Sequence, residues 1–174
     1  MRRFFAGKGV FKMTAIVYTT NTGSTKRYAE MLGEKTGFPV FALADAASVE
    51  KGSEIIYLGW VMAGSVQGLE PARETFGSLK AVCAVGTLPG EKAEADIKEK
   101  NNITEPFFFL QGAFDLSKLK GMYKMMMGMM VRMMKSKLKE SNDPDSKKIL
   151  ETFEAGMDFV SEENLEPVLK WLEQ

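Results

Sequence analysis

Five short apolar runs, separated by longer segments with helical spacing, constrain the fold of this 174-residue chain more than any other feature. The runs have the length and composition of strands buried on both faces of a sheet. They occupy residues 14–19, 39–43, 54–59, 80–86 and 105–110, and helical patterns occupy 26–36, 69–79, 91–100 and 165–172. Because strands and helices alternate, we expect a parallel sheet with right-handed crossovers and helices on both faces.

The predicted sheet also indicates where a ligand would bind. Five strands suit a three-layer α/β sandwich with the strand order 2-1-3-4-5, in which ligands bind outside the carboxyl ends of the strands. The loops after the first, third and fourth strands are therefore the candidate site. We expect one domain over residues 13–174, preceded by a disordered N-terminal extension at 1–12, since chain ends are commonly disordered.

Composition excludes several classes of function. The chain has no histidine, so the commonest metal ligand, haem ligand and general base are all absent. Its one cysteine, Cys83, lies in an apolar run and is expected to be a buried, unreactive thiol. The single cysteine favours a cytoplasmic location, and since no apolar run reaches 18 residues we expect the protein to be soluble or at most peripheral to the membrane. The chemistry is expected to come from a cofactor.

The loop after the first strand is rich in hydroxyl side chains. Its residues are Thr20, Asn21, Thr22, Gly23, Ser24 and Thr25, placed where the first helix begins. Hydroxyls, N–H groups at the Gly23 turn and the positive end of the helix dipole could together bind a phosphate. The alternative is that Ser24 or Thr25 only caps the helix. The loop lacks the Gly-Lys-Ser/Thr of a Walker loop and the Gly-x-Gly-x-x-Gly of dinucleotide-binding folds.

This loop resembles the phosphate loop of the flavodoxin family, Ser/Thr-x-Thr-Gly-x-Thr, and the similarity extends over about residues 14–112. The resemblance implies that the chain binds FMN through this loop and holds the flavin ring with the two other loops. The ring-binding residues are then Trp60, Val61, Met62, Ala63 and Gly64 after the third strand, and Thr87, Leu88, Pro89 and Gly90 after the fourth. Trp60 is the stacking candidate, although it could instead pack the end of the sheet.

The fourth-strand loop lacks the aromatic residue that flavodoxins usually place there, so the second face of the flavin should be more open or covered by another segment.

A basic, methionine-rich segment at about 116–139 is predicted to form an additional helix. It holds eight of the thirteen methionines, and residues 118–139 carry seven cations and no acid. Lys120, Lys124 and Arg132 share a polar stripe, and Met126 and Met130 lie on a broad opposite face. The helix could pack on the sheet as core, or act as a lid or an interfacial helix on anionic membrane. Nucleic acid is not an expected partner, because no aromatic residues interleave the cations.

This segment follows Gly112 and Ala113 in an arrangement that is similar to the flavodoxin-like protoporphyrinogen oxidases. That resemblance implies an FMN-dependent oxidoreductase that passes electrons to a quinone at the membrane surface, with no catalytic side chain of its own. The alternative is a non-enzymatic electron carrier that docks on redox partner proteins. Carriers of this fold are typically acidic, whereas this chain has a net charge of zero and one basic segment.

Overall fold

The computed structural model describes residues 12–87, 89–140, 151 and 154–174. Five parallel strands form the central sheet: β1 (Thr14–Tyr18), β2 (Val40–Ala42), β3 (Glu54–Met62), β5 (Ala81–Gly86) and β6 (Phe107–Gln111). They lie in the order β2-β1-β3-β5-β6, with β1 paired in parallel to both β2 and β3. Among the five strands expected from the sequence, this is the predicted order 2-1-3-4-5. The doubly wound α/β fold is confirmed.

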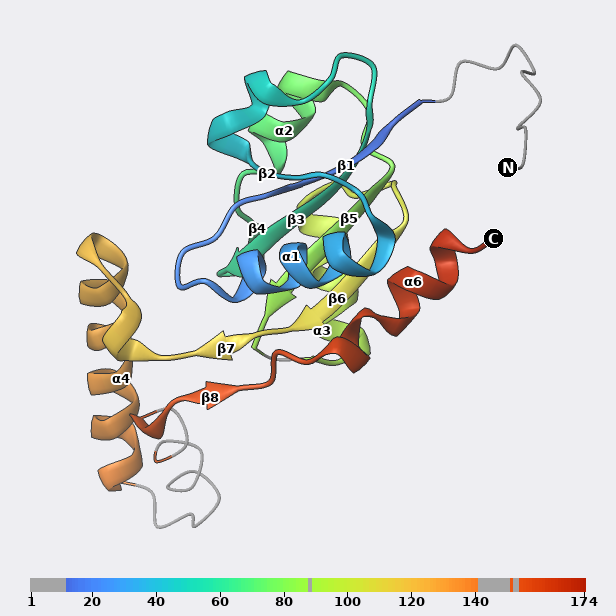
Figure 1. Ribbon diagram of the computed structural model, residues 1–174. Coiled ribbons are helices and arrows are strands. Elements are labelled where there is room, and N and C mark those ends of the chain that lie inside the picture. Colours follow the sequence, from blue (N-terminus) through green and yellow to red (C-terminus); the bar gives the residue numbers. More distant parts are fainter. Residues whose placement is uncertain (1–11, 88, 141–150, 152–153) are drawn as a thin grey trace, which may run out of the picture.

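Helices cover both faces of this sheet (Figure 1). On one face α1 (Ser24–Thr36) and α6 (Glu166–Leu172) pack on alternate strand residues such as Ile16 and Ile56. On the other face α2 (Leu69–Phe76), α3 (Glu91–Lys100) and the 3₁₀ turn η1 (Leu43–Ser48) lie against residues such as Val17 and Tyr57. Because successive strand residues point to opposite faces, each strand contributes to two separate cores. The three-layer sandwich follows from that alternation.

Strand β3 is longer than predicted. The sequence places Trp60, Val61 and Met62 in a loop, and that prediction is wrong, since all three lie on β3. The strand turns at Ala63 and Gly64 into the antiparallel strand β4 (Ser65–Val66), with Met62 paired to Ser65. Both turn residues have positive φ, 47° and 77°, as a two-residue hairpin turn requires.

A second unit projects from the carboxyl ends of the sheet (Figure 1). After β6 the chain forms β7 (Ala113–Phe114), a 3₁₀ turn η2 (Leu116–Lys118) and helix α4 (Gly121–Glu140). Strand β8 (Met157–Asp158) pairs with β7 in antiparallel fashion, and η3 (Glu162–Leu165) leads into α6. The predicted additional helix at 116–139 corresponds to α4. Of the predicted N-terminal extension, residues 1–11 lie outside the described residues.

Within the described ranges, we find no helix with the length and hydrophobicity needed to cross a lipid bilayer.

Candidate functional site

A cavity of about 760 Å³ lies at the carboxyl ends of β1, β3 and β5, between the sheet and α4. This is the edge where doubly wound folds bind ligands. Five residues of the predicted phosphate loop line it at one end: Thr20, Asn21, Thr22, Ser24 and Thr25. The methionines of α4 line the opposite wall. The cavity is therefore polar at one end and apolar over most of its surface.

The start of α1 has no side-chain cap. Gly23 is the N-cap residue in a left-handed conformation, with φ 101°, and no side chain of the described residues hydrogen-bonds to the helix start. The alternative in which Ser24 or Thr25 only caps the helix is therefore wrong. The N–H of Gly23 itself donates to Thr20 Oγ1 at 3.0 Å, so it is not free for a ligand as the sequence suggested. The turn orients the loop, and the uncapped helix start remains available to an anion.

Two buried polar atoms of the loop lack hydrogen-bond partners. Asn21 Nδ2 and Thr25 Oγ1 are shielded from solvent without a partner among the described residues, and Thr25 as a whole is only 1% exposed. An unsatisfied buried donor or hydroxyl is costly, so such groups indicate a ligand that completes their bonding. Both can donate to an oxyanion. A phosphate monoester beside the helix start fits these two residues.

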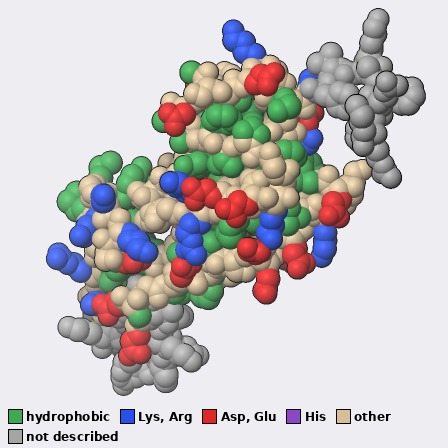
Figure 2. All heavy atoms as spheres, viewed as in Figure 1, with side chains coloured by type: hydrophobic (Ala, Val, Ile, Leu, Met, Phe, Trp, Pro, Cys, Tyr) green, Lys and Arg blue, Asp and Glu red, His purple; other side chains and the backbone are tan. Residues whose placement is uncertain are grey.

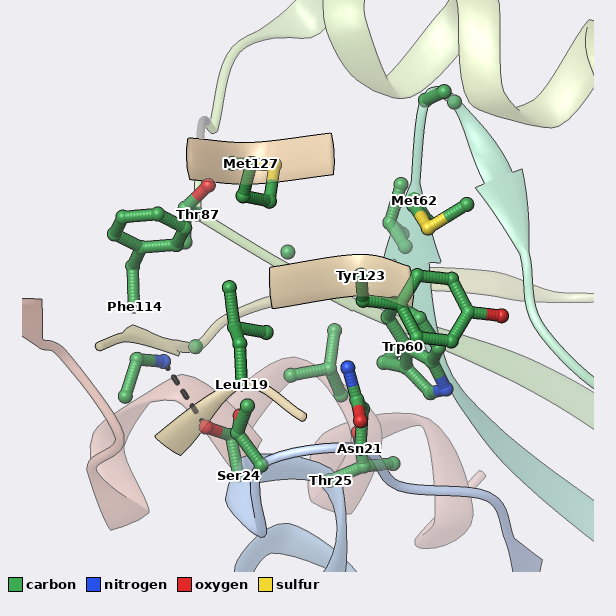
Figure 3. A pocket seen from close by; sticks show the side chains of 18 of the residues that line it. Asn21, Ser24, Thr25, Trp60, Met62, Thr87, Phe114, Leu119, Tyr123 and Met127 are labelled. Carbon is green, nitrogen blue, oxygen red and sulfur yellow. Dashed lines mark hydrogen bonds between the residues drawn. The ribbon is translucent and has the colours of Figure 1, made fainter. Parts of the chain in front are cut away.

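Ser24 has a different partner. Its Oγ accepts a hydrogen bond from the N–H of Ala113 at 3.2 Å, shown as the dashed line in Figure 3. Thr20 Oγ1 likewise accepts from Gly23. Each hydroxyl keeps its own hydrogen, so both remain able to donate to a phosphate. Gly23, the remaining residue of the six-residue loop, does not line the cavity.

The predicted ring-binding residues are partly brought together. Trp60, Val61, Met62, Ala63 and Gly64 all line the cavity, as does Thr87. Pro89 and Gly90 are not among the lining residues, and Leu88 lies outside the described residues. The Ala63 and Gly64 carbonyls already accept from Lys100 Nζ at 2.6 Å and from Asn101 Nδ2 at 2.8 Å. The side chains at the end of α3 therefore hold this turn against the cavity.

The wall formed by α4 was only partly foreseen from the sequence. The sequence leaves the second face of the flavin either more open or covered by another segment, and the position of α4 on the cavity wall is consistent with the second alternative. Met126 and Met130 are among the methionines that the sequence places on the apolar face of this helix, but it does not indicate the wall residues that precede the helix. From the segment before α4 the wall has Phe114, Asp115 and Leu119, and from α4 itself it has Tyr123, Met126, Met127, Met129, Met130 and Met133. Met126 and Met130 are 40% and 46% exposed, so the alternative of a core helix packed on the sheet is wrong for this face. The methionine stripe in the sequence predicts an apolar helix face. Which part of the molecule that face lines depends on contacts between residues far apart in the sequence.

Residues of α3 form another part of the wall that the sequence did not indicate. Ala93, Asp96 and Ile97 line the cavity, although the sequence predicts only a helix at 91–100 and no part in the site.

Titratable groups near the site do not supply a reactive nucleophile. Cys83 lies in the sheet core outside the cavity lining, and burial raises the pKa of its thiol to about 12, which confirms the predicted buried cysteine. Asp115 lies at the cavity edge, where hydrogen bonds from the side chain and backbone of Ser117 lower the pKa of its carboxyl. We find no cluster of three or more His, Cys, Asp or Glu side chains suited to a metal in the described part of the chain.

Fold and site together define a doubly wound α/β protein in which the start of α1 borders an apolar cavity at the carboxyl edge of the sheet. The family model for the flavodoxin domain matches residues 15–141, which is well over half of the chain. The chain therefore belongs to the flavodoxin domain family, and membership indicates a flavin-binding redox function. Comparison with curated proteins finds no significant match.

Proposed function

We propose that this chain is an FMN-binding oxidoreductase that exchanges electrons with an apolar acceptor, such as a quinone, at an anionic membrane surface. The observation that carries the proposal is that one cavity joins the phosphate loop to the methionine face of α4. A volume of about 760 Å³ is within the range of pockets that bind cofactors and drug-sized ligands. FMN, when bound, supplies the electron transfer that the side chains of this chain cannot perform.

The residues have separate roles in this proposal. Asn21 and Thr25 bind the phosphate with their unpartnered polar atoms, and the start of α1 adds its positive dipole. Trp60 supplies an aromatic surface for the flavin ring. Met126 and Met130 exclude water and provide an adaptable apolar surface for a second flat molecule.

The outer face of α4 supports the membrane part of the proposal. Met122 and Met125 are 72% and 68% exposed and lie outside the cavity lining. Lys124 and Arg132 have no ion-pair partner among the described residues, whereas Lys135 pairs with Glu154. Figure 2 shows hydrophobic and basic side chains close together over α4, at the left of the view. Exposed methionines beside free cations match the apolar interior and anionic headgroups of a lipid surface.

The resemblance to protoporphyrinogen oxidases suggests a porphyrinogen as the electron donor, which is also a large, flat molecule. The competing function is an electron carrier without a substrate of its own, which docks on redox partner proteins. A carrier needs only an accessible flavin edge, so an apolar wall that continues beyond the phosphate loop favours the enzyme.

The first experiment tests the cofactor. The purified chain is mixed with FMN, freed of excess flavin, and its visible spectrum is recorded. Flavin absorption bands that stay with the protein support the proposal. If no bands remain after FMN is added, the proposed function is wrong.

The second experiment separates the enzyme from the carrier. Reoxidation of the reduced flavoprotein by a soluble menaquinone analogue is compared for Met126→Gln/Met130→Gln, which line the cavity, and the control Met122→Gln/Met125→Gln, which do not. Gln preserves helix propensity, so α4 should persist in both. A rate that falls only in the cavity variant supports the enzyme. Equal rates in all three proteins, or no reaction with the quinone, favour the carrier.

The same pair of variants tests the membrane surface. Pelleting with vesicles that contain anionic lipid should weaken in the control variant, Met122→Gln/Met125→Gln, and should weaken with added salt. Binding that ignores both the anionic lipid and the salt would exclude this part of the proposal.

A further inference from the structure

Helix α4 is anchored to the phosphate-binding helix through the strands on either side of it in the sequence. Ser24, the first residue of α1, accepts the N–H of Ala113 on β7 at 3.2 Å. One turn further along α1, Arg27 Nη1 donates to Asp158 Oδ2 on β8 at 2.7 Å. The base of the α4 unit is therefore positioned by α1.

A second contact holds α4 on the opposite side of the cavity. The rings of Tyr123 on α4 and Trp60 on β3 have centroids 5.3 Å apart and planes at 87° to each other. This is the edge-to-face geometry that aromatic pairs favour. Both residues line the cavity, and Figure 3 shows their rings next to each other. The α4 unit is therefore held to α1 at its base and to β3 through Tyr123.

We infer that Tyr123 is a positioning residue of the flavin site, which holds the indole of Trp60 in the orientation that receives the flavin ring. This inference rests on the proposed function. Trp60 lies near the end of β3 and is only partly buried, and its edge-to-face contact with Tyr123 restricts the orientation of the indole. Residues 87–90 contain no aromatic side chain that could do this. The aromatic neighbour of Trp60 thus comes from α4 and not from the loop after β5.

The first test observes Trp60 without any flavin. Trp171 is the only other tryptophan, so Trp171→Phe makes Trp60 the single indole reporter. In this background Tyr123→Ala should shift Trp60 emission to longer wavelength and lower its anisotropy, whereas Tyr123→Phe, which keeps the ring, should not. Unchanged emission and anisotropy in Tyr123→Ala would overturn the inference.

The second test measures binding of FMN and of riboflavin, which lacks the phosphate, by quenching of flavin fluorescence. Tyr123→Ala should weaken both flavins by the same factor, about twofold to tenfold, as the loss of one aromatic pair predicts. Tyr123→Phe should retain the affinity. The exposed neighbour Met122→Ala, which does not line the cavity, is the matched control and should bind both normally.

The outcomes separate this inference from the function on which it rests. If the wild-type chain binds neither flavin, the proposed function is wrong and the inference falls with it. If it binds both, and Tyr123→Ala binds them equally well, the inference alone is wrong. Should Tyr123→Ala lose its far-ultraviolet circular dichroism, Tyr123→Leu keeps the apolar volume without the ring and is judged by the same two readouts.

Discussion

Thr25→Val should have opposite effects on the ligand-free chain and on the FMN complex. Thr25 is 1% exposed and its Oγ1 has no partner among the described residues. A buried hydroxyl without a partner carries a desolvation penalty of about 1–3 kcal/mol. Valine replaces that hydroxyl with a methyl of similar size. The ligand-free variant should therefore be more stable by about 1 kcal/mol or more, which corresponds to a Tm higher by about 2–4 °C per kcal/mol in a domain of this size.

FMN binding should change in the other direction. A hydrogen bond to a charged phosphate contributes about 1.5–3 kcal/mol, so its loss should weaken FMN by roughly 10-fold to 100-fold. Riboflavin affinity should stay the same, because riboflavin carries no phosphate. Thr25→Val should thus weaken FMN alone, whereas Tyr123→Ala should weaken both flavins by the same factor.

The assay compares Tm in phosphate-free buffer after removal of flavin, followed by titration with each flavin. Thr22→Val is the matched control. Thr22 also lines the cavity but is only partly buried, so water can hydrogen-bond to its hydroxyl. Its ligand-free Tm should change little. If Thr25→Val destabilises the ligand-free chain, or binds FMN as tightly as the wild type, the assignment of Thr25 to the phosphate site is wrong.

Three further predictions concern stability, each measured by urea denaturation. Ala63→Gly should stabilise the chain by about 0.5–1 kcal/mol, because φ 47° strains alanine by more than glycine's extra entropy costs; a loss of stability would refute this. Gly68→Ala should destabilise it by about 3 kcal/mol, since φ is 77° and a Cβ would lie 2.4 Å from the Tyr57 hydroxyl; a near-neutral effect would contradict that packing. Burial is the largest single influence on the Glu105 carboxyl and raises its pKa, but the hydrogen bonds from Arg73 and from the backbone, together with the charge of Arg73, outweigh it, so the net pKa is below its ordinary value. The ionised Glu105 therefore adds to the free energy of unfolding above about pH 4.5, and this contribution is lost as pH falls through the folded-state pKa. Glu105→Gln should lose less stability than wild type on acidification. Equal losses in the two proteins would exclude the Arg73–Glu105 pair as the source.

The features that the sequence predicted well are local ones. The strand, the loop and the start of α1 fall within one short stretch, so residue types and spacing are enough to predict these elements and the hydroxyl-rich loop that lines the cavity. The end of β3 was missed for a physical reason. Gly59 looks like a turn residue, but it lies inside the strand, where a Cβ would come 2.6 Å from Val66 Cγ1 and 2.7 Å from the Gln67 carbonyl. The glycine permits the close approach of β4.

The α4 wall shows a second limit. Its amphipathic pattern predicts a helix with an apolar face, but the pattern cannot say what that face meets. That depends on the anchoring of β7 and β8 to α1, through Ser24 and Arg27. The contact between Trp60 and Tyr123 joins residues from elements far apart in the sequence, and no spacing rule brings them together.

The arrangement at the start of α1 also bears on why the chain carries so many hydroxyls there. One hydroxyl would be enough to cap the helix, but Gly23 takes the cap position and none of the side chains caps it. Ser24 instead hydrogen-bonds to β7, and the Thr25 hydroxyl is buried without a partner among the residues that the structure describes. The Thr25 hydroxyl does not stabilise the ligand-free chain, because valine would fill the same space without the desolvation penalty of a buried hydroxyl. The Thr25 hydroxyl would contribute favourably once an anion accepted its hydrogen bond. The neighbouring Ser24 hydrogen-bonds to β7, so the base of the α4 wall lies beside the same helix start where that anion would bind.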